Sequence, residues 1–260
     1  MERMTQRLKI SVIIPAYNCE DKIVGAIQSA IAQTYPVFEI IVINDGSTDN
    51  TLTVIRNIAN NWAFLPSLCI LDQVNQGQSM ARNSGINSSK GDWIAFLDAD
   101  DVWLPEKIEK QINVLKENPN VVIIGTGILS SNYNVSHVKV SFNAMLFRNV
   151  FNTSSVLVKK SEMPAEYFDK GMRYAEDFRV WIQIVRSKEG IVLNEGLIKY
   201  ATNEKRFKRN SLSTKLWQME KGELSNFNFL YRRNYINIFT YGIVSVYSLM
   251  KFLRRVLLSL

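Results

Sequence analysis

Three aspartates directly follow an apolar run in the segment WIAFLDADDVWLPEK, residues 93–107. Like charges this close repel and raise each other's pKa, so the cluster suits a site that receives a cation. Side chains two residues apart in an extended backbone point to the same side, which pairs Asp98 with Asp100 and turns Asp101 away. With no lysine beside them in the sequence, the two carboxylates predict a site for Mg²⁺ or Mn²⁺. The structural alternative is an acidic turn that caps the next helix, and a lone DxD pattern is weak evidence against it.

Two further polar positions follow other apolar runs. Asp45 lies in the turn NDGSTDN, residues 44–50, where a carboxylate could accept from a base N–H or a ribose hydroxyl, or simply form an Asx turn. Arg82 follows the loop NQGQS, residues 75–79, and could meet a phosphate, stack on a base, or pair with an acid at the surface.

An acidic pair, Glu176 and Asp177, opens the amphipathic segment YAEDFRVWIQI, residues 174–184. One carboxylate is enough to remove a proton from an attacking hydroxyl. Acids in the first turn of a helix are also stabilised by the helix dipole, and this is the structural alternative. The sequence shows no Ser/His/Asp or Cys/His set, and the single histidine, His137, is interpreted as structural.

The first half of the chain alternates predicted strands and helices, which is typical of an α/β fold with a right-handed, mostly parallel sheet flanked by helices. The run FEIIVI, residues 38–43, has no polar alternation and predicts a strand buried on both faces. Ligands of such sheets bind at the carboxyl ends of the strands, where the polar clusters occur. We expect strands over residues 9–14, 38–43, 67–71, 92–97 and 121–125, and helices from a cap at Asn18 to 31, and over 51–59, 77–88 and 105–117. The pattern weakens after residue 130, with strands expected over 152–160, 191–194 and 197–201 and a helix opening at 174.

Composition places the chain among ordinary globular proteins, with 260 residues, 47% hydrophobic and 21% charged. Two cysteines are too few for a disulfide framework, and no signal peptide is apparent. The formal charge of +7 is concentrated at the end, because residues 205–260 hold eleven Lys/Arg and two Asp/Glu. A basic tail indicates an anionic partner, which could be a membrane surface, a nucleic acid or a phosphorylated ligand.

Taken together, three ordered stretches resemble family 2 of the glycosyltransferases, which has the GT-A fold. They are SVIIPAYN through NDGSTDNT (11–51), NQGQSMARN through EKIEKQ (75–111) and YAEDFRVWIQI (174–184). The resemblance is dense over residues 9–117, thinner to about 200 and absent beyond about 215.

The resemblance implies roles for the residues that match the family's motifs. Pro15, Ala16, Tyr17 and Asp45 would hold the nucleoside of a nucleotide-sugar, and Arg82 would help to bind the nucleotide.

For the reaction itself, the resemblance implies that Asp98 lies near the ribose and the metal. Asp100 would bind Mn²⁺ or Mg²⁺ on the diphosphate, and Asp177 would be the general base in a single displacement that inverts the anomeric centre.

Two departures from the family pattern refine this expectation. Asn44 stands where the family often has a first aspartate, and the retained Asp45 is the one expected to touch the base. The Gln-x-x-Arg-Trp signature of processive polymerases is missing after Asp177, which favours transfer of a single sugar. The basic segment 205–209 with Ser211 and Ser213 is interpreted either as a loop that closes on the diphosphate or as a solvated loop.

The C-terminal segment, residues 231–260, mixes aromatic, aliphatic and basic residues. Its longest uncharged run, 234–250, is shorter than a usual membrane span, so a helix lying on anionic lipid fits better. A terminal helix packed on the protein or on a second subunit is the alternative.

The sequence therefore predicts a metal-dependent inverting glycosyltransferase that moves one sugar from a nucleotide-sugar, UDP-linked by family tendency, to a glycan hydroxyl. The tail favours a lipid-linked acceptor in cell-surface polysaccharide or lipopolysaccharide assembly, and a cytoplasmic protein peripheral on the inner face of the membrane, with no nucleic-acid partner. We expect a GT-A domain over 1–212, with a nucleotide-binding half (1–125) and an acceptor-binding half (126–212), and a helical tail over 213–260.

Rival functions remain open at this stage. A non-catalytic nucleotide-binding or membrane-scaffold protein with the same fold is the first alternative. An aspartate-based phosphatase would need its nucleophile after the first strand, where this chain has Pro15-Ala16-Tyr17. A dinucleotide oxidoreductase is disfavoured because no GxGxxG follows that strand.

Overall fold

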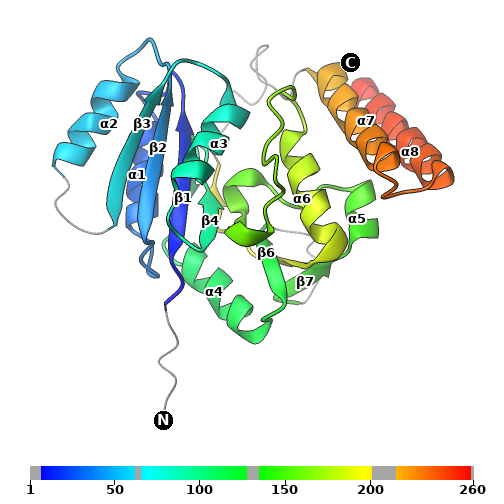
Figure 1. The fold of residues 1–260 in the computed structure, drawn as a ribbon, viewed down its shortest axis with the longest axis horizontal. Helices are drawn as coiled ribbons and strands as arrows, with labels where there is room; N and C mark the ends of the chain where they lie inside the picture. The colour runs from blue at the N-terminus through cyan, green and yellow to red at the C-terminus, as the bar shows by residue number, and fades with distance from the viewer. Residues whose placement is uncertain (1–6, 62–65, 128–134, 201–214, 259–260) are drawn as a thin grey trace.

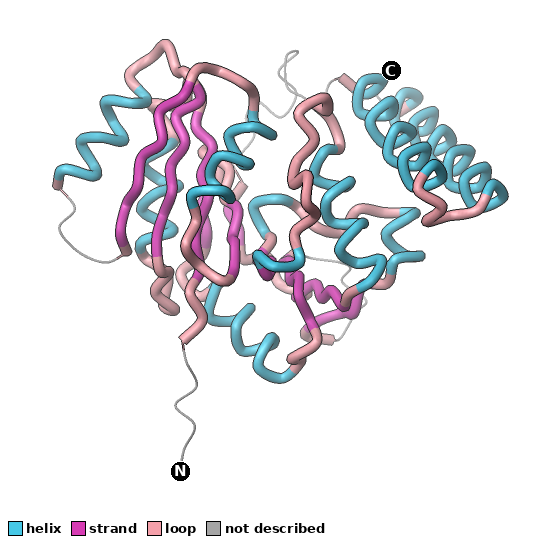
Figure 2. The backbone as a smooth tube through the Cα atoms, in the orientation of Figure 1, coloured by secondary structure: helices cyan, strands magenta, loops and turns pink. Residues whose placement is uncertain are grey.

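The structure is a computed structural model that describes residues 7–61, 66–127, 135–200 and 215–258. A twisted sheet carries helices on both faces, and two long helices lie side by side at the end opposite α2 (Figures 1 and 2). The first half contains β1 (Ile10–Ala16), α1 (Ile23–Ile31), β2 (Glu39–Asp45), α2 (Thr51–Asn60), β3 (Ser67–Gln73), α3 (Gln78–Ser88) and β4 (Trp93–Phe96). The second half contains β5 (Val102–Trp103), α4 (Lys107–Glu117), β6 (Val121–Thr126), β7 (His137–Val140), α5 (Phe142–Phe147), β8 (Leu157–Lys159), α6 (Glu176–Ser187), β9 (Glu189–Leu193), β10 (Ile198–Lys199), α7 (Leu216–Arg232) and α8 (Ile238–Leu257).

Among the residues that the structure describes, the main sheet has eight strands in the order β3-β2-β1-β4-β8-β6-β9-β7. Strands β3, β2, β1 and β4 pair in parallel, which confirms the α/β class expected from the first half of the sequence. The second half departs from a parallel pattern, because β8 lies antiparallel between β4 and β6, and β7 pairs antiparallel with β9. The carboxyl ends of β1, β2 and β4 therefore face the same edge, where the polar clusters follow.

Both faces of the sheet are buried by helices. Successive residues of β1 alternate between two hydrophobic clusters, with Val12 in one and Ile13 in the other. The cluster that contains Val12 receives residues of α1 and α4, and the cluster that contains Ile13 receives residues of α3 and α6. All seven residues of β2 are buried, which confirms the interpretation of residues 39–43 of the run FEIIVI, whereas Phe38 lies before the strand and is 37% exposed.

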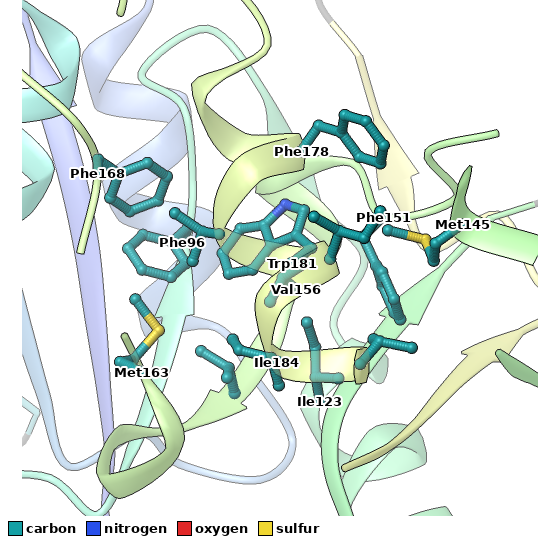
Figure 3. Packing of buried hydrophobic residues seen from close by; sticks show 14 of the residues in the cluster. Phe96, Ile123, Met145, Phe151, Val156, Met163, Phe168, Phe178, Trp181 and Ile184 are labelled. Atoms are coloured by element: carbon teal, nitrogen blue, oxygen red, sulfur yellow. The ribbon is translucent and has the colours of Figure 1, made fainter. Parts of the chain in front are cut away.

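An aromatic cluster fixes α6 against the end of β4. The ring of Phe96 packs 5.4 Å from that of Phe168 and 5.7 Å from that of Trp181, centroid to centroid (Figure 3). Phe168 and Trp181 meet edge to face at 5.8 Å. Edge-to-face aromatic pairs favour one relative orientation, so the start of α6 is held at a defined position relative to the sheet.

Some expectations about local structure were wrong. Asn18 does not cap α1, whose N-cap is Lys22 without a side-chain hydrogen bond. Asn18 instead adopts a left-handed conformation with φ 46°, and its Oδ1 accepts from the backbone N–H of Thr48 at 2.8 Å. This bond ties the loop after β1 to the loop after β2. The short elements β5, β7 and α5 were not anticipated.

The C-terminal helices pack on the second half of the domain. Helix α7 contacts α6, and α8 contacts both α7 and α5. The ring of Tyr247 lies 5.3 Å from that of Phe147, and the Lys251 ammonium donates to the carbonyl oxygen of Phe147 at 3.1 Å. Within the described ranges, no helix has both the length and the hydropathy needed to cross a bilayer.

Candidate active site

A pocket of about 990 Å³ opens at the carboxyl ends of β1, β2 and β4. Six of the residues predicted to bind nucleotide and metal line it, namely Pro15, Ala16, Tyr17, Asp45, Asp98 and Asp100. Arg82 and Asp177 do not belong to the lining, although Arg82 donates to the lining residues Asp98 and Glu176. Residues 170–173 and Glu176 form a wall contributed by the second half, so the pocket lies between the two halves of the chain.

Asp45 organises the loop that forms one wall of the pocket. Its side chain is only 3% exposed, and Oδ1 accepts from Gln73 Nε2 at 2.8 Å and from the N–H of Gln76 at 2.9 Å. Oδ2 accepts from the N–H of Gly77 at 2.8 Å. The loop passes so close that a Cβ on Gly46 would lie 2.6 Å from the nitrogen of Asn75, which requires glycine there. The carboxylate thus orders the loop and keeps lone-pair capacity for one further donor.

The turn after β4 separates its three aspartates. Asp98 and Asp100 line the pocket, whereas Asp101 is buried and accepts from Ser154 Oγ at 2.6 Å. The same hydroxyl oxygen accepts from the N–H of Asp98 at 3.1 Å, so Ser154 fixes the turn. Lys22 lies 3.8 Å from Asp100 Oδ2, with both side chains about half exposed. No lysine neighbours these aspartates in the sequence, and the expectation that none lies beside them was wrong. The loop before α1 folds over the turn and brings Lys22 next to Asp100.

The carboxylates of Asp98 and Asp100 fit a hard divalent cation through the chemistry of their oxygens. No group of three or more His, Cys, Asp or Glu residues suited to a metal occurs in the described part of the chain. An ion held here would take its remaining ligands from water and from phosphate oxygens, which is the usual arrangement for magnesium with nucleotides.

Arg82 is a buried bridge between the two halves of the site. It is 2% exposed, and its guanidinium donates to Asp98 Oδ1 at 2.9 Å and to Glu176 Oε1 at 3.1 Å. Its Cζ lies 5.2 Å from the centroid of the Phe168 ring. Burial alone would lower the pKa of Arg82, but the two carboxylates outweigh it and raise that pKa. The arginine therefore stays charged and holds the end of β4 against the start of α6.

The acidic pair at the start of α6 follows a left-handed residue, Ala175, with φ 55°. Glu176 lines the pocket, and Asp177 Oδ2 accepts from Thr153 Oγ1 at 3.2 Å. Burial raises the pKa of both carboxyls, and Arg82 opposes that rise. A carboxylate with a raised pKa is a stronger proton acceptor, which suits a general base.

Several pocket residues had not been singled out from the sequence. Gln78 donates through Nε2 to Asp98 Oδ1 at 3.1 Å, and Lys170 and Arg173 line the wall before α6. Glu176 had been noted only as the neighbour of Asp177. The available signal was the position of Gln78 in the stretch NQGQS, but no local pattern places residues 170–173 at the same pocket. The basic segment 205–209 lies outside the described residues.

The family model described as Glycosyl transferase family 2 matches residues 11–168. This chain belongs to glycosyltransferase family 2. The family model spans β1 through the aromatic cluster at Phe168, and so includes Asp45, Arg82 and the DxD turn. The family resemblance read from the sequence is thereby confirmed, and the chain is a glycosyltransferase.

Named relatives agree with this assignment. The chain is 32% identical, over 186 residues, to the Escherichia coli protein UDP-Glc:alpha-D-GlcNAc-diphosphoundecaprenol beta-1,3-glucosyltransferase WfaP. That alignment covers 68% of this chain and 70% of the relative.

Solved structures share the fold. The mannosyltransferase PcManGT from Pyrobaculum calidifontis, in complex with GDP-Man and Mn²⁺, aligns with a TM-score of 0.69 and 18% identity over 88% of this chain and 65% of that one. TarS from S. aureus, in complex with UDP-GlcNAc, aligns with a TM-score of 0.67 and 19% identity over 86% and 67% of the respective chains. The GT-A fold expected from the sequence is therefore confirmed.

Proposed function

We propose that this glycosyltransferase moves a single sugar from a UDP-sugar to a hydroxyl of a lipid-linked glycan, with inversion at the anomeric carbon and with Mn²⁺ or Mg²⁺ held by Asp98 and Asp100. The observation that carries the proposal is the convergence of Tyr17, Asp45 and the two DxD carboxylates on one pocket at the strand ends. Non-covalent binding of a nucleotide at this edge is the usual arrangement in α/β sheets.

The two ends of the pocket have different tasks in this proposal. Pro15, Ala16 and Tyr17 hold the nucleoside, with the Asp45-ordered loop closing beside it. A divalent cation at Asp98 and Asp100 would neutralise negative charge on the departing diphosphate.

Asp177 is the proposed general base on the acceptor hydroxyl. Its pKa is raised by burial, so it accepts a proton more readily than an exposed aspartate does. It directly follows Glu176, which lines the pocket and is anchored by Arg82. Burial raises the pKa of both carboxyls, and the Arg82 charge opposes that rise and favours their ionised form.

The acceptor class is supported by the relative from E. coli, whose name specifies GlcNAc-diphosphoundecaprenol as acceptor and UDP-Glc as donor. A lipid-linked acceptor would place the enzyme in cell-surface polysaccharide or lipopolysaccharide assembly, at the inner face of the membrane. The complex of the Pyrobaculum calidifontis mannosyltransferase with GDP-Man makes GDP-sugars the alternative donors to test.

Helix α8 supports peripheral contact with the membrane. A stripe of large apolar side chains at spacings of three and four residues is exposed along it, and Phe239, Ile243, Val246, Met250 and Leu253 are each between 57% and 79% exposed. The basic Arg254 is also exposed, near the end of the same helix. An apolar face with neighbouring cations suits the surface of an anionic bilayer.

Vesicle binding tests this membrane contact with the full chain. Val246→Glu combined with Met250→Glu should weaken binding to vesicles that contain anionic lipid, whereas the control Val135→Glu, at an exposed valine outside α8, should not. Equal sedimentation of all three proteins with vesicles would remove the membrane proposal and favour a packed or oligomeric tail.

Transfer of labelled sugar tests the activity directly. The full-length enzyme is incubated with a panel of UDP- and GDP-sugars, Mn²⁺ and an undecaprenyl-diphosphate-linked sugar, and the linkage of the product is read by NMR. We expect transfer from a UDP-sugar with inverted configuration, lost in Asp177→Ala. Retained configuration would exclude the proposed mechanism, and no transfer from any donor would favour the non-catalytic alternative.

A further inference from the structure

We propose that helix α7 is a positioning element of the active site, in which Gly222 and Asn226 hold the turn that presents Glu176 and Asp177. The C-terminal helices would then be required for the chemical step itself, in addition to any contact with a membrane. The proposal rests on the proposed function, since it takes Asp177 as the base.

The turn before α6 needs an external restraint. Ala175 adopts the left-handed conformation, with φ 55° and ψ 26°, which a residue with a Cβ holds only when its surroundings impose it. This one residue separates the pocket-lining segment 170–173 and Tyr174 from the first turn of α6. A change at Ala175 would therefore redirect the carboxylates of Glu176 and Asp177.

Asn226 of α7 supplies that restraint. Its side chain is fully buried, and Nδ2 donates to the carbonyl oxygen of Ala175 at 2.8 Å. Its Oδ1 accepts from Nε of Arg179 at 2.8 Å, one turn further along α6. A single amide thus joins the left-handed residue to the helix that follows it.

Gly222 lies one helical turn before Asn226, on the same face of α7. A Cβ at this position would lie 2.5 Å from the carbonyl oxygen of Tyr174 and 3.0 Å from its carbonyl carbon. These are backbone atoms, so they could make room only if the turn itself moved. The backbone of α7 therefore sits directly against the peptide that precedes Ala175.

Arg179 extends the same restraint to the wall of the pocket. Its guanidinium donates to Asp169 Oδ2 at 2.7 Å and to Ser225 Oγ at 3.0 Å. Asp169 immediately precedes the pocket-lining residues 170–173. Helix α7 therefore contacts Tyr174 and Ala175 directly, and it reaches Asp169 only through Arg179.

Helix α7 is also fixed to α8, through two of its carboxylates. Glu220 Oε2 accepts from the Arg255 guanidinium at 3.1 Å, and Glu223 Oε2 accepts from Ser248 Oγ at 2.8 Å. A continuous set of contacts therefore runs from α8 through α7 to the Tyr174–Ala175 turn.

Two helical glycines provide a matched test. Gly222→Ala inserts a methyl group against the turn, whereas Gly242→Ala, inside α8, meets nothing within 4 Å. Alanine favours the helix equally at both sites, so any difference reports the contact with the turn. We expect Gly222→Ala to keep UDP affinity within about twofold and to lower kcat by about 10- to 100-fold, because small misplacements of a catalytic group cost that much. Gly242→Ala should keep wild-type kcat.

Two further readouts distinguish positioning from a general loss of fold. The acid limb of the kcat profile should move to higher pH in Gly222→Ala, because a displaced turn carries the carboxylates away from Arg82. Amide hydrogen exchange of residues 174–178 should be faster than in Gly242→Ala, and this readout does not depend on turnover. Asn226→Leu, of similar size, should repeat the effects if Gly222→Ala does not fold.

The outcomes separate the two proposals. An active wild type with unchanged kcat, pH limb and exchange in both Gly222→Ala and Asn226→Leu would overturn the positioning role and leave the proposed function intact. A wild type without transferase activity would overturn the proposed function, while exchange at residues 174–178 would still decide whether α7 restrains the turn.

Discussion

Replacing Arg82 by methionine should lower the free energy of unfolding of the protein. The Arg82 side chain is 3% exposed, and its guanidinium bridges Asp98 and Glu176 at 2.9 and 3.1 Å. Methionine has a similar length and fills the space, but it leaves both carboxylates without their cation. Removing one partner of a buried ion pair exposes the remaining charge to an apolar environment, and this cost dominates.

The size of the loss in stability depends on how far the two carboxylates regain hydration when the guanidinium is removed. Breaking a buried pair costs about 3–5 kcal/mol. Asp98 is 28% exposed and Glu176 13% exposed, so both can regain part of their hydration, and we take about 3 kcal/mol. For a chain of this size that loss lowers Tm by about 6–12 °C.

Urea unfolding followed by circular dichroism measures this cost. Arg56→Met is the matched control, because Arg56 pairs with Asp72 at 3.7 Å with side chains 60% and 46% exposed. A surface pair of this kind contributes about 0–1 kcal/mol. A loss in Arg82→Met no larger than in Arg56→Met would refute the argument that Arg82 is a buried bridge.

Three further predictions follow from other sites. The acid limb of the kcat profile should lie above pH 4, because burial raises the pKa of Asp177 and a general base must be ionised; an apparent pKa at or below the usual aspartate value of about 3.9 would contradict this. Gly85→Ala should destabilise the fold by about 1–3 kcal/mol in urea, since its Cβ would lie 2.6 Å from Ile13 Cγ2 and 2.9 Å from Ile43 Cδ1. Burial lowers the pKa of Lys107 well below its usual value, so the folded state loses stability as pH falls below about 10. The effect of Lys107→Met on the free energy of unfolding should therefore be more favourable at pH 7 than at pH 9, and equal effects at both would be inconsistent with a lowered pKa of Lys107.

Much of the nucleotide-binding half could be predicted from local sequence. The unalternating run 38–43 requires burial on both faces, which only a sheet covered by helices on each side provides. Parallel strands bring their carboxyl ends to one edge, so Pro15, Asp45 and Asp98 could be placed at one crevice without a structure. The pattern sufficed because each of these residues lies at the carboxyl end of a strand or just past it.

The contacts that these residues make could not be predicted in the same way. Asp45 accepts from Gln76 and Gly77, which lie beyond the next strand, and Lys22 reaches Asp100 from another loop. Such pairs depend on how loops fold over one another, for which the sequence has no periodic signal.

The second half was predicted least well. Of the strand expected over 152–160, only Leu157–Lys159 forms β8, because residues 153–155 form a 3-10 turn, and the sequence did not indicate that β8 pairs antiparallel with β4. The prediction for the tail used its apolar and basic composition. Composition does not indicate that the buried Asn226 of α7 would pack against the start of α6. The division at residue 212 between a catalytic domain and a tail remains a prediction.

Calorimetric titration of UDP tests the central claim most directly, with and without Mn²⁺, on the wild type and on Asp100→Ala. Asp100 is about half exposed and contacts only Lys22 among the ion pairs of the described chain, so its replacement should leave the fold intact. We predict binding of UDP by the wild type that strengthens with Mn²⁺, and loss of that strengthening in Asp100→Ala. Metal-independent binding that is identical in both proteins would contradict a metal site at the DxD turn, and absence of binding of any nucleoside diphosphate would contradict the donor site itself.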